Sequence, residues 1–234
     1  MNQIAARKTK ATKYNSPKRL AAIGANVIER LNAHPRVQWL ESPYAQIYAH
    51  QNFLSDAECA YFIKRINENA QPSTLYSGTE QEGFRTSYSC NVDINDPQIN
   101  DIDQKICDLF GIPVSHSEIL QGQRYEVGQQ FKPHHDFFHE EAVYWKKEAR
   151  NGGQRSWTAM VFLNEPEEGG ETDFTQLEYK VPPRKGMLLA WNNMLPDGRP
   201  NMNTLHAGTP IVRGTKYIIT KWFRLNRWEG RPVE

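Results

Sequence analysis

Residues 124–138 read RYEVGQQFKPHHDFF, a strand-like run that carries two histidines and an aspartate. Side chains alternate between the two faces of a strand, so His134 and Asp136 are predicted to share one face and His135 to point the other way. One imidazole and one carboxylate on the same face could hold a metal ion together. A His-x-Asp pair arises easily by chance, so this pair needs support from the rest of the chain.

A third metal ligand has to come from another segment, and His206 is the best-placed histidine. It lies in the run LHAGTP at 205–210, directly before a further strand candidate. Two histidines and one aspartate form the facial triad that suits non-haem Fe(II), because three protein ligands leave three positions of an octahedral ion open. The alternative is that the three residues are unrelated polar side chains.

Lys216 stands in an apolar run, GTKYIITKW at 214–222, ten residues after His206. An unpaired ammonium group is costly to bury, so a lysine here is expected to meet a carboxylate in the core of a barrel. The alternative is a lysine on an edge strand that faces water.

Short strand patterns dominate the chain after residue 115, and turn signals such as Glu168-Gly169-Gly170 separate them. Many short strands with frequent turns predict a β-sandwich or barrel. The expected strands cover 117–126, 130–138, 156–164, 172–180, 186–191, 203–206 and 216–224.

Three helices are expected ahead of this β core, which gives an α+β chain with a mainly β core. Ser16-Pro17 opens the first helix, Ser55 begins a capping box for the second, and Asp96-Pro97 opens the third. The expected helices run over 17–33, from Ser55 to about 69, and from Asp96 to Gly111. Short strands are expected at 37–40, 45–49 and 85–92, with a long loop over 70–84.

Charge is unevenly distributed along the 234 residues. Residues 1–36 hold eight lysines or arginines against one acid, Glu29, which predicts a basic N-terminal extension with one amphipathic helix before a single catalytic domain at 37–234. Such a tail is usually solvated. Weak contact with nucleic acid or an acidic partner is an alternative, and a mitochondrial transit peptide is another.

Hydropathy and cysteine usage exclude several classes of protein. No run approaches 18 apolar residues, so a transmembrane helix and a membrane partner are excluded, and no apolar run of a secretory signal follows the N-terminal charges. The three cysteines show no metal-type spacing and indicate free thiols in a reducing compartment. We therefore expect a cytoplasmic protein.

Several segments in register resemble the prolyl 4-hydroxylase branch of the 2-oxoglutarate/Fe(II) oxygenases, over roughly residues 37 to 225. The resembling segments are 124–138, GGET at 169–172, the block from His206 through Lys216 to Trp222, NFLS at 52–55, RTS at 85–87 and GIPV at 111–114. The resemblance implies a double-stranded β-helix, a cupin-like jelly roll, with helices in support. It implies Fe(II), 2-oxoglutarate and O2 as cofactor and cosubstrates, with ascorbate as a further candidate.

The resemblance also assigns roles to single residues. It implies His134, Asp136 and His206 as catalytic iron ligands, Lys216 as the partner of the distal carboxylate of 2-oxoglutarate, and Tyr125 and Thr172 near that cosubstrate. It implies that Arg155, Trp222 and Phe131 face a peptide, and that residues 73–88 form a loop that closes over it. Phe131 departs from the family, which often has a tyrosine there.

The expected activity is hydroxylation of a prolyl residue at C4 in a protein or peptide, with release of succinate and CO2. Two alternatives remain. The same chemistry could act on another side chain, a free amino acid or a small molecule, because fold and cofactor do not determine the substrate. A catalytically silent binding protein could use the same barrel, although an intact triad with Lys216 argues against it.

Overall fold

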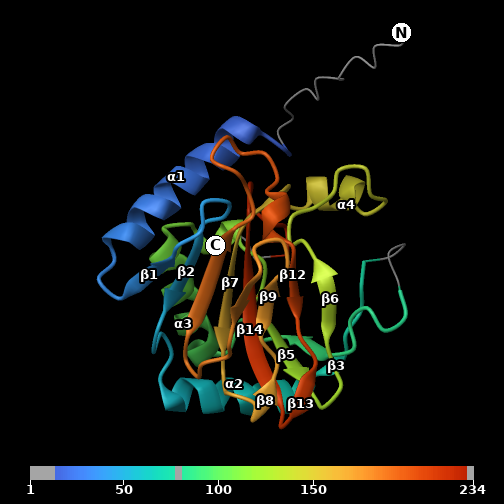
Figure 1. Ribbon diagram of the computed structural model, residues 1–234. Helices are drawn as coiled ribbons and strands as arrows, with labels where there is room; N and C mark the ends of the chain where they lie inside the picture. Colours follow the sequence, from blue (N-terminus) through green and yellow to red (C-terminus); the bar gives the residue numbers. More distant parts are fainter. Residues whose placement is uncertain (1–13, 77–80, 231–234) are drawn as a thin grey trace.

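Residues 14–76 and 81–230 are described by the computed structural model (Figure 1). The helices are α1 (Pro17–Ala33), α2 (Asp56–Asn69), α3 (Pro97–Phe110) and α4 (Trp145–Arg150), with 3-10 turns η1 (Val114–His116) and η2 (Met202–Thr204). The strands are β1 (Val37–Leu40), β2 (Ile47–His50), β3 (Gln71–Pro72), β4 (Tyr88–Asn91), β5 (Gln121–Tyr125), β6 (Phe131–His134), β7 (Arg155–Phe162), β8 (Glu168–Gly169), β9 (Thr172–Phe174), β10 (Tyr179–Val181), β11 (Leu188–Asn192), β12 (His206–Gly208), β13 (Ile211–Arg213) and β14 (Lys216–Arg224). No described helix has the length and apolar character needed to cross a membrane.

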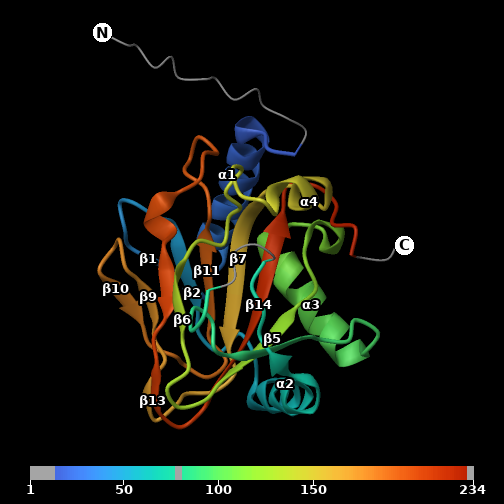
Figure 2. The same ribbon diagram turned by 90° about the vertical axis from the view of Figure 1, so that its right-hand side faces the viewer.

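Two antiparallel sheets form the β core. The main sheet has the order β1-β2-β11-β7-β14-β5-β4-β3, the smaller sheet has the order β10-β9-β12-β6, and β13 pairs with β8. Figure 2 shows the smaller sheet on one side of the main sheet and helices α2 and α3 on the other. In the middle of the main sheet, β2, β11, β7, β14 and β5 lie side by side although they are distant in sequence, and β12 and β6 do so in the smaller sheet, as in the double-stranded β-helix that the resemblance implied.

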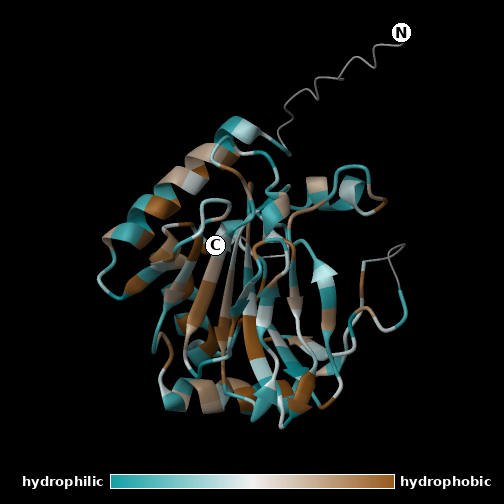
Figure 3. Ribbon diagram, viewed as in Figure 1, coloured by the Kyte–Doolittle hydropathy of each residue, from teal (hydrophilic) through white to brown (hydrophobic). Residues whose placement is uncertain are grey.

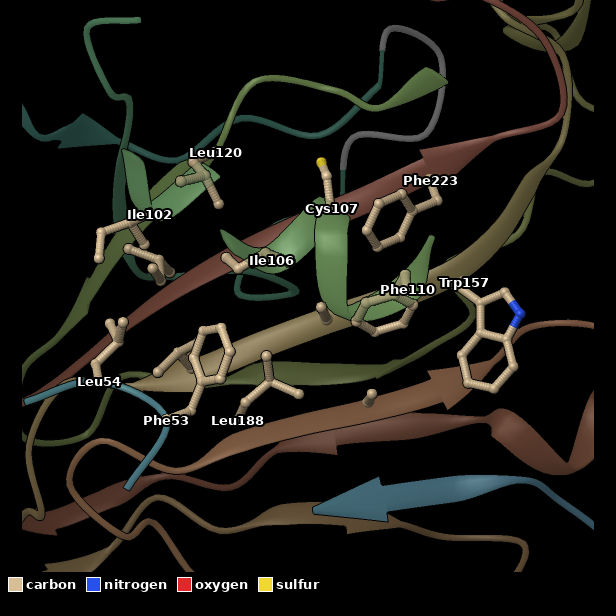
Figure 4. Close-up of a cluster of buried hydrophobic side chains, with 14 of the residues drawn as sticks. Phe53, Leu54, Ile102, Ile106, Cys107, Phe110, Leu120, Trp157, Leu188 and Phe223 are labelled. Carbon is tan, nitrogen blue, oxygen red and sulfur yellow. The ribbon is translucent and has the colours of Figure 1, made fainter. Parts of the chain in front are cut away.

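The helix-side core lies between the main sheet and the helices (Figure 4). Phe110 of α3 packs on Phe223 of β14 with ring centroids 4.6 Å apart and meets Trp157 of β7 edge-on at 5.8 Å. Full burial of each such side chain contributes about 1.5–3 kcal/mol. This core therefore holds α3 firmly against the two central strands, β7 and β14.

The inter-sheet core lies between the two sheets and includes Phe162, Phe174, Leu189, Trp191 and Ile218. Phe174 meets Trp191 edge-on, with ring centroids 5.5 Å apart. Figure 3 shows apolar segments on the strands inside the fold, while the outer helices alternate apolar and polar bands. Because both faces of the main sheet are covered, β7 is buried along its whole length.

The three helices predicted from helix-start signals are present as α1, α2 and α3. Ser55 accepts a hydrogen bond from the Glu58 backbone and Glu58 returns one, so the predicted capping box is present. Gly111 ends α3 in the left-handed region at φ 64°. Ser16 occupies the N-cap position of α1, but its side chain makes no capping hydrogen bond.

Several strand predictions were wrong in their limits: the runs 85–92 and 117–126 shorten to β4 and β5, β3 lies inside the expected loop 70–84, and three further runs differ for reasons that the structure shows. The run 130–138 ends as a strand at His134, because His134 pairs with His206, the first residue of its partner β12. The run 172–180 is a hairpin of β9 and β10, turned where Glu178 adopts φ 51°. The run 203–206 is η2 followed by β12, because the Asn201 side chain accepts from the Asn203 backbone and starts a 3-10 turn.

Candidate active site

The triad predicted from the sequence comes together between the two sheets. His134 ends β6 and His206 begins β12, directly opposite each other in the ladder, while Asp136 lies in the bend after β6. Nε2 of His134 lies 3.9 Å from Oδ1 of Asp136, and Nε2 of His206 lies 3.8 Å from Oδ2. One donor atom from each residue lies within 4.8 Å of the others, a spacing that could hold one metal ion.

Hydrogen bonds orient the triad for metal binding. Nδ1 of His134 lies 2.9 Å from the Lys132 carbonyl oxygen, and Nδ1 of His206 lies 2.9 Å from the Thr204 carbonyl oxygen. Each imidazole therefore donates through Nδ1 and keeps Nε2 as the free donor atom towards Asp136. Partners of this kind set the tautomer and the ring orientation of a metal ligand.

The protonation states also fit a divalent cation. Burial, together with the neighbouring His206, lowers the pKa of His134 to about 3, so its imidazole is neutral. Burial alone would raise the pKa of Asp136, but His206, His134 and Arg155 outweigh it and hold that pKa below its usual value. A neutral imidazole and an ionised carboxylate are the forms in which these two groups bind a metal.

His135 takes no part in the triad. Its Nε2 lies 3.1 Å from the Met202 carbonyl oxygen, and its ring contacts Phe137 rather than the triad histidines. The prediction that His135 points away is confirmed. Strand alternation explains the orientation of His134 only, because Asp136 reaches the same side from a bend outside β6.

Lys216 lines a small cavity beside the triad, and the edge-lysine alternative is wrong. It begins the central strand β14 and is only 2% exposed. Among the described residues no carboxylate forms an ion pair with it; Glu171 acts on it only at longer range, and burial lowers the pKa of Lys216 to about 7. A buried cation without a carboxylate partner fits the far end of a small dianion such as 2-oxoglutarate.

Tyr125 and Thr172 line the same small cavity, as expected. The Tyr125 hydroxyl donates to Oε1 of Gln123 at 2.7 Å, and Nε2 of Gln123 donates to the Thr220 hydroxyl at 3.0 Å. Sequence reasoning missed Gln123 and Thr220. A polar residue two positions before Tyr125 on one strand face was the signal for Gln123.

A larger cavity of about 570 Å³ opens from the triad towards solvent. Phe131, Arg155 and Trp222, the three residues expected to face a peptide, all line it together with His134 and Asp136. Phe131 stacks on His134 with ring centroids 3.6 Å apart. The departure from tyrosine at 131 therefore leaves an apolar ring directly beside a metal-ligand histidine.

Arg155 belongs to a buried ion-pair network that the sequence did not reveal. Its guanidinium lies 4.2 Å from the Trp222 ring centroid and binds both oxygens of Glu118, at 2.6 and 2.7 Å. Glu118 also accepts from Arg224 at 2.9 Å, and Arg224 pairs with Glu148 at 2.9 Å. Arg155 is thus held rigidly in the cavity wall.

Comparisons with known proteins agree with this geometry. Residues 120–224 match the 2OG-Fe(II) oxygenase superfamily. The chain is 31% identical over 220 residues to a probable prolyl 4-hydroxylase 10 of Arabidopsis thaliana, covering 82% of this chain and 74% of the relative. It is 28% identical to a putative prolyl 4-hydroxylase of Acanthamoeba polyphaga mimivirus, covering 79% and 76%.

A solved structure is similar as well. The viral collagen prolyl hydroxylase of Paramecium Bursaria Chlorella virus-1, in complex with 2-oxoglutarate, superposes with a TM-score of 0.57 at 28% identity, over 76% of this chain and 95% of the viral chain. Its fold supports the double-stranded β-helix, and the triad with Lys216 fits Fe(II) and 2-oxoglutarate. The chain therefore belongs to the 2-oxoglutarate/Fe(II)-dependent oxygenases, in their prolyl 4-hydroxylase-like branch.

Proposed function

We propose that this dioxygenase hydroxylates prolyl residues at C4 in a protein or peptide. The observation that carries the proposal is the shape of the larger cavity, which brings aromatic walls directly to the triad. Phe131 and Trp222 line it beside His134 and Asp136, so a proline ring that enters the cavity meets aromatic side chains next to the triad. The relatives named as prolyl 4-hydroxylases support the same substrate class.

Different residues of the chain would bind the metal and the cosubstrate. His134, Asp136 and His206 would hold Fe(II), and Lys216 would bind the distal carboxylate of 2-oxoglutarate in the small cavity. When bound, iron and 2-oxoglutarate with O2 supply the oxidising power needed to hydroxylate an unactivated carbon, with succinate and CO2 as by-products. Met160, Trp191 and Ile218 line the small cavity and give it an apolar wall.

Peptide pairs that differ at one residue test the proposal. Proline-containing peptides and their Pro→Ala counterparts are incubated with Fe(II), 2-oxoglutarate and O2, and succinate and peptide mass are measured. We expect one added oxygen atom per succinate on the proline peptides only, located at C4 by amino-acid analysis. Stoichiometric hydroxylation of another side chain, a free amino acid or a small molecule would instead assign the same chemistry to that substrate. Asp136→Ala is the inactive control.

The cytoplasmic location and the solvated basic tail stay predictions. The tail residues Arg7, Lys8, Lys10 and Lys13 lie outside the described residues, as does part of the expected loop at 70–84. Cell fractionation checks the location.

A further inference from the structure

Arg85 lines the larger cavity, and its partners in the described structure are all uncharged. Nη2 donates to Oε1 of Gln121 at 2.8 Å, and Nε donates to the Ser87 hydroxyl at 3.3 Å. The guanidinium lies 5.0 Å from the ring centroid of Phe131. Across residues 14–76 and 81–230, no carboxylate forms an ion pair with Arg85.

Arg85 is half-buried, and three fully buried cations of the main sheet, by contrast, form ion pairs. Arg155 and Arg224 share Glu118, and Lys221 pairs with Asp103. Burial of a guanidinium without a carboxylate is unfavourable, and burial accordingly lowers the pKa of Arg85. Arg85 is therefore a half-buried positive charge without an ion-pair partner in the described part of the chain, and Asp136 acts on it only at longer range.

The two acidic residues that line the same cavity already interact with other groups. Glu118 binds Arg155 with both oxygens and also accepts from Arg224. Asp136 faces both triad histidines and accepts from Thr158. The positive charge of Arg85 is therefore available to a ligand that enters the cavity.

Arg85 is also close to the reaction centre. Phe131 contacts Arg85 and stacks on His134, so one aromatic residue links the guanidinium to a triad histidine. An extended peptide advances about 3.3 Å per residue, so a group bound at Arg85 belongs to a residue within a few positions of the one at the triad.

We propose that Arg85 binds a carboxylate of the substrate, so that the preferred peptides carry an acidic group within a few residues of the hydroxylated proline. This inference rests on the proposed prolyl hydroxylation and narrows its substrate class. An Asp or Glu side chain and a chain-terminal carboxylate offer the same chemistry, and a guanidinium can bind either with two parallel hydrogen bonds.

A peptide panel tests the inference on the Mn(II)- and 2-oxoglutarate-loaded protein. Each peptide has one proline, with Glu or Gln at one of the two positions before or after it, and a C-terminal carboxylate or amide. Calorimetry measures the Kd, and hydroxylation of the same peptides is measured with Fe(II). We expect one position, or the free terminus, at which removing the negative charge weakens binding about tenfold or more.

Two variants assign that preference to Arg85. Arg85→Gln should abolish the preference and leave 2-oxoglutarate affinity unchanged, and Arg85→Glu should prefer a lysine at the same position. Arg124→Gln is the matched control: it removes the same charge from β5, but Arg124 pairs with Glu126 at 3.3 Å and lines neither cavity. Arg124→Gln should keep the acidic preference.

The outcomes separate the two proposals. Efficient hydroxylation of proline peptides with no charge preference, or a preference that survives Arg85→Gln, overturns the inference and leaves prolyl hydroxylation standing. A loss of 2-oxoglutarate affinity in Arg85→Gln with unchanged peptide binding also overturns it, by moving Arg85 to the cosubstrate. Absence of proline hydroxylation across the whole panel rejects the proposed function, and the inference with it.

Discussion

The Thr158 hydroxyl donates a 2.7 Å hydrogen bond to Oδ2 of Asp136, the same oxygen that lies 3.8 Å from Nε2 of His206. Asn193 in turn donates to Thr158 at 3.0 Å. A buried chain of hydrogen bonds, from Asn193 after β11 through Thr158 of β7, thus orients the carboxylate, although Asp136 itself lies in a bend.

Thr158→Val should weaken metal binding about tenfold to a hundredfold, because the isosteric side chain leaves Asp136 without its orienting donor. Titration with Mn(II) or anaerobic Fe(II) measures this. Ser156→Ala on the same strand is the control, since Ser156 donates to the Phe223 carbonyl oxygen instead. Equal losses in both variants would indicate a general effect on β7.

Alanine substitution should distinguish the three triad residues from the adjacent His135 by their effects on metal binding and turnover. His134→Ala, Asp136→Ala and His206→Ala should each abolish turnover and metal binding, whereas His135→Ala should keep substantial activity because its ring points away from the triad. Metal titration and succinate release measure both. Loss of metal binding in His135→Ala, with retention in His134→Ala, would contradict the assignment.

Lys216→Ala should weaken 2-oxoglutarate binding by roughly two to three orders of magnitude, because it leaves a carboxylate buried and unpaired. Metal affinity should be unchanged, and Lys216→Arg should be intermediate at best because a guanidinium is bulkier. Calorimetry on Mn(II)-loaded protein measures this. Unchanged 2-oxoglutarate affinity in Lys216→Ala would remove the lysine from the cosubstrate site.

The pH dependence of 2-oxoglutarate binding should report the same lysine. Burial lowers the pKa of Lys216 to about 7 in the unliganded protein, so the amine is charged below that pH and largely neutral above it. The dianion binds the charged form, so affinity should fall above pH 7, by at most about tenfold per pH unit, with proton uptake on binding. Lys216→Ala should lack this slope.

Arg155→Ala should raise the KM for peptide more than the KM for 2-oxoglutarate. Arg155 lines the larger cavity and not the smaller one, and Glu118 keeps Arg224 as a partner when Arg155 is removed. Steady-state kinetics measure both constants, with the exposed Arg184→Ala as control. A change in the KM for 2-oxoglutarate alone would remove Arg155 from the peptide site.

The pair of Lys221 with Asp103 should matter for stability rather than catalysis. Both side chains are almost fully buried and join β14 to α3. Lys221→Met should lower the free energy of unfolding by about 3–5 kcal/mol, because it leaves a buried carboxylate without its cation, and the double variant with Asp103→Leu should recover most of this. Urea denaturation measures the effect. A double variant no more stable than the single one would argue against the pair.

The helix ends that were predicted correctly depend on residues close to them in the sequence. Ser55 and Gly111 act within one turn of their helices, so nearby residues suffice to place those ends. His134, His206 and Lys216 could be identified from the sequence because each lies in or beside a recognisable strand run. The exact end of β6 could not be predicted, because it depends on where β12 begins, some 70 residues later.

The ion-pair network could not be predicted for a related reason. Glu118, Glu148 and Arg224 come from three separate segments, and only the fold brings them together. A sequence does not show which of its many charged residues are buried. Gln123 and Thr158 are likewise ordinary strand residues until their cavity or carboxylate partner is known.

The two cavities meet at Phe131, His134, Asp136 and Trp222, and this shared wall has a consequence for inhibitor design. A compound that chelates the metal and extends a carboxylate to Lys216 would compete with 2-oxoglutarate, and any enzyme using that cosubstrate is open to the same chemistry. Discrimination among such enzymes has to come from the larger cavity. A second acidic group directed past the Phe131 ring towards Arg85 would extend such a chelator from the metal site into the larger cavity.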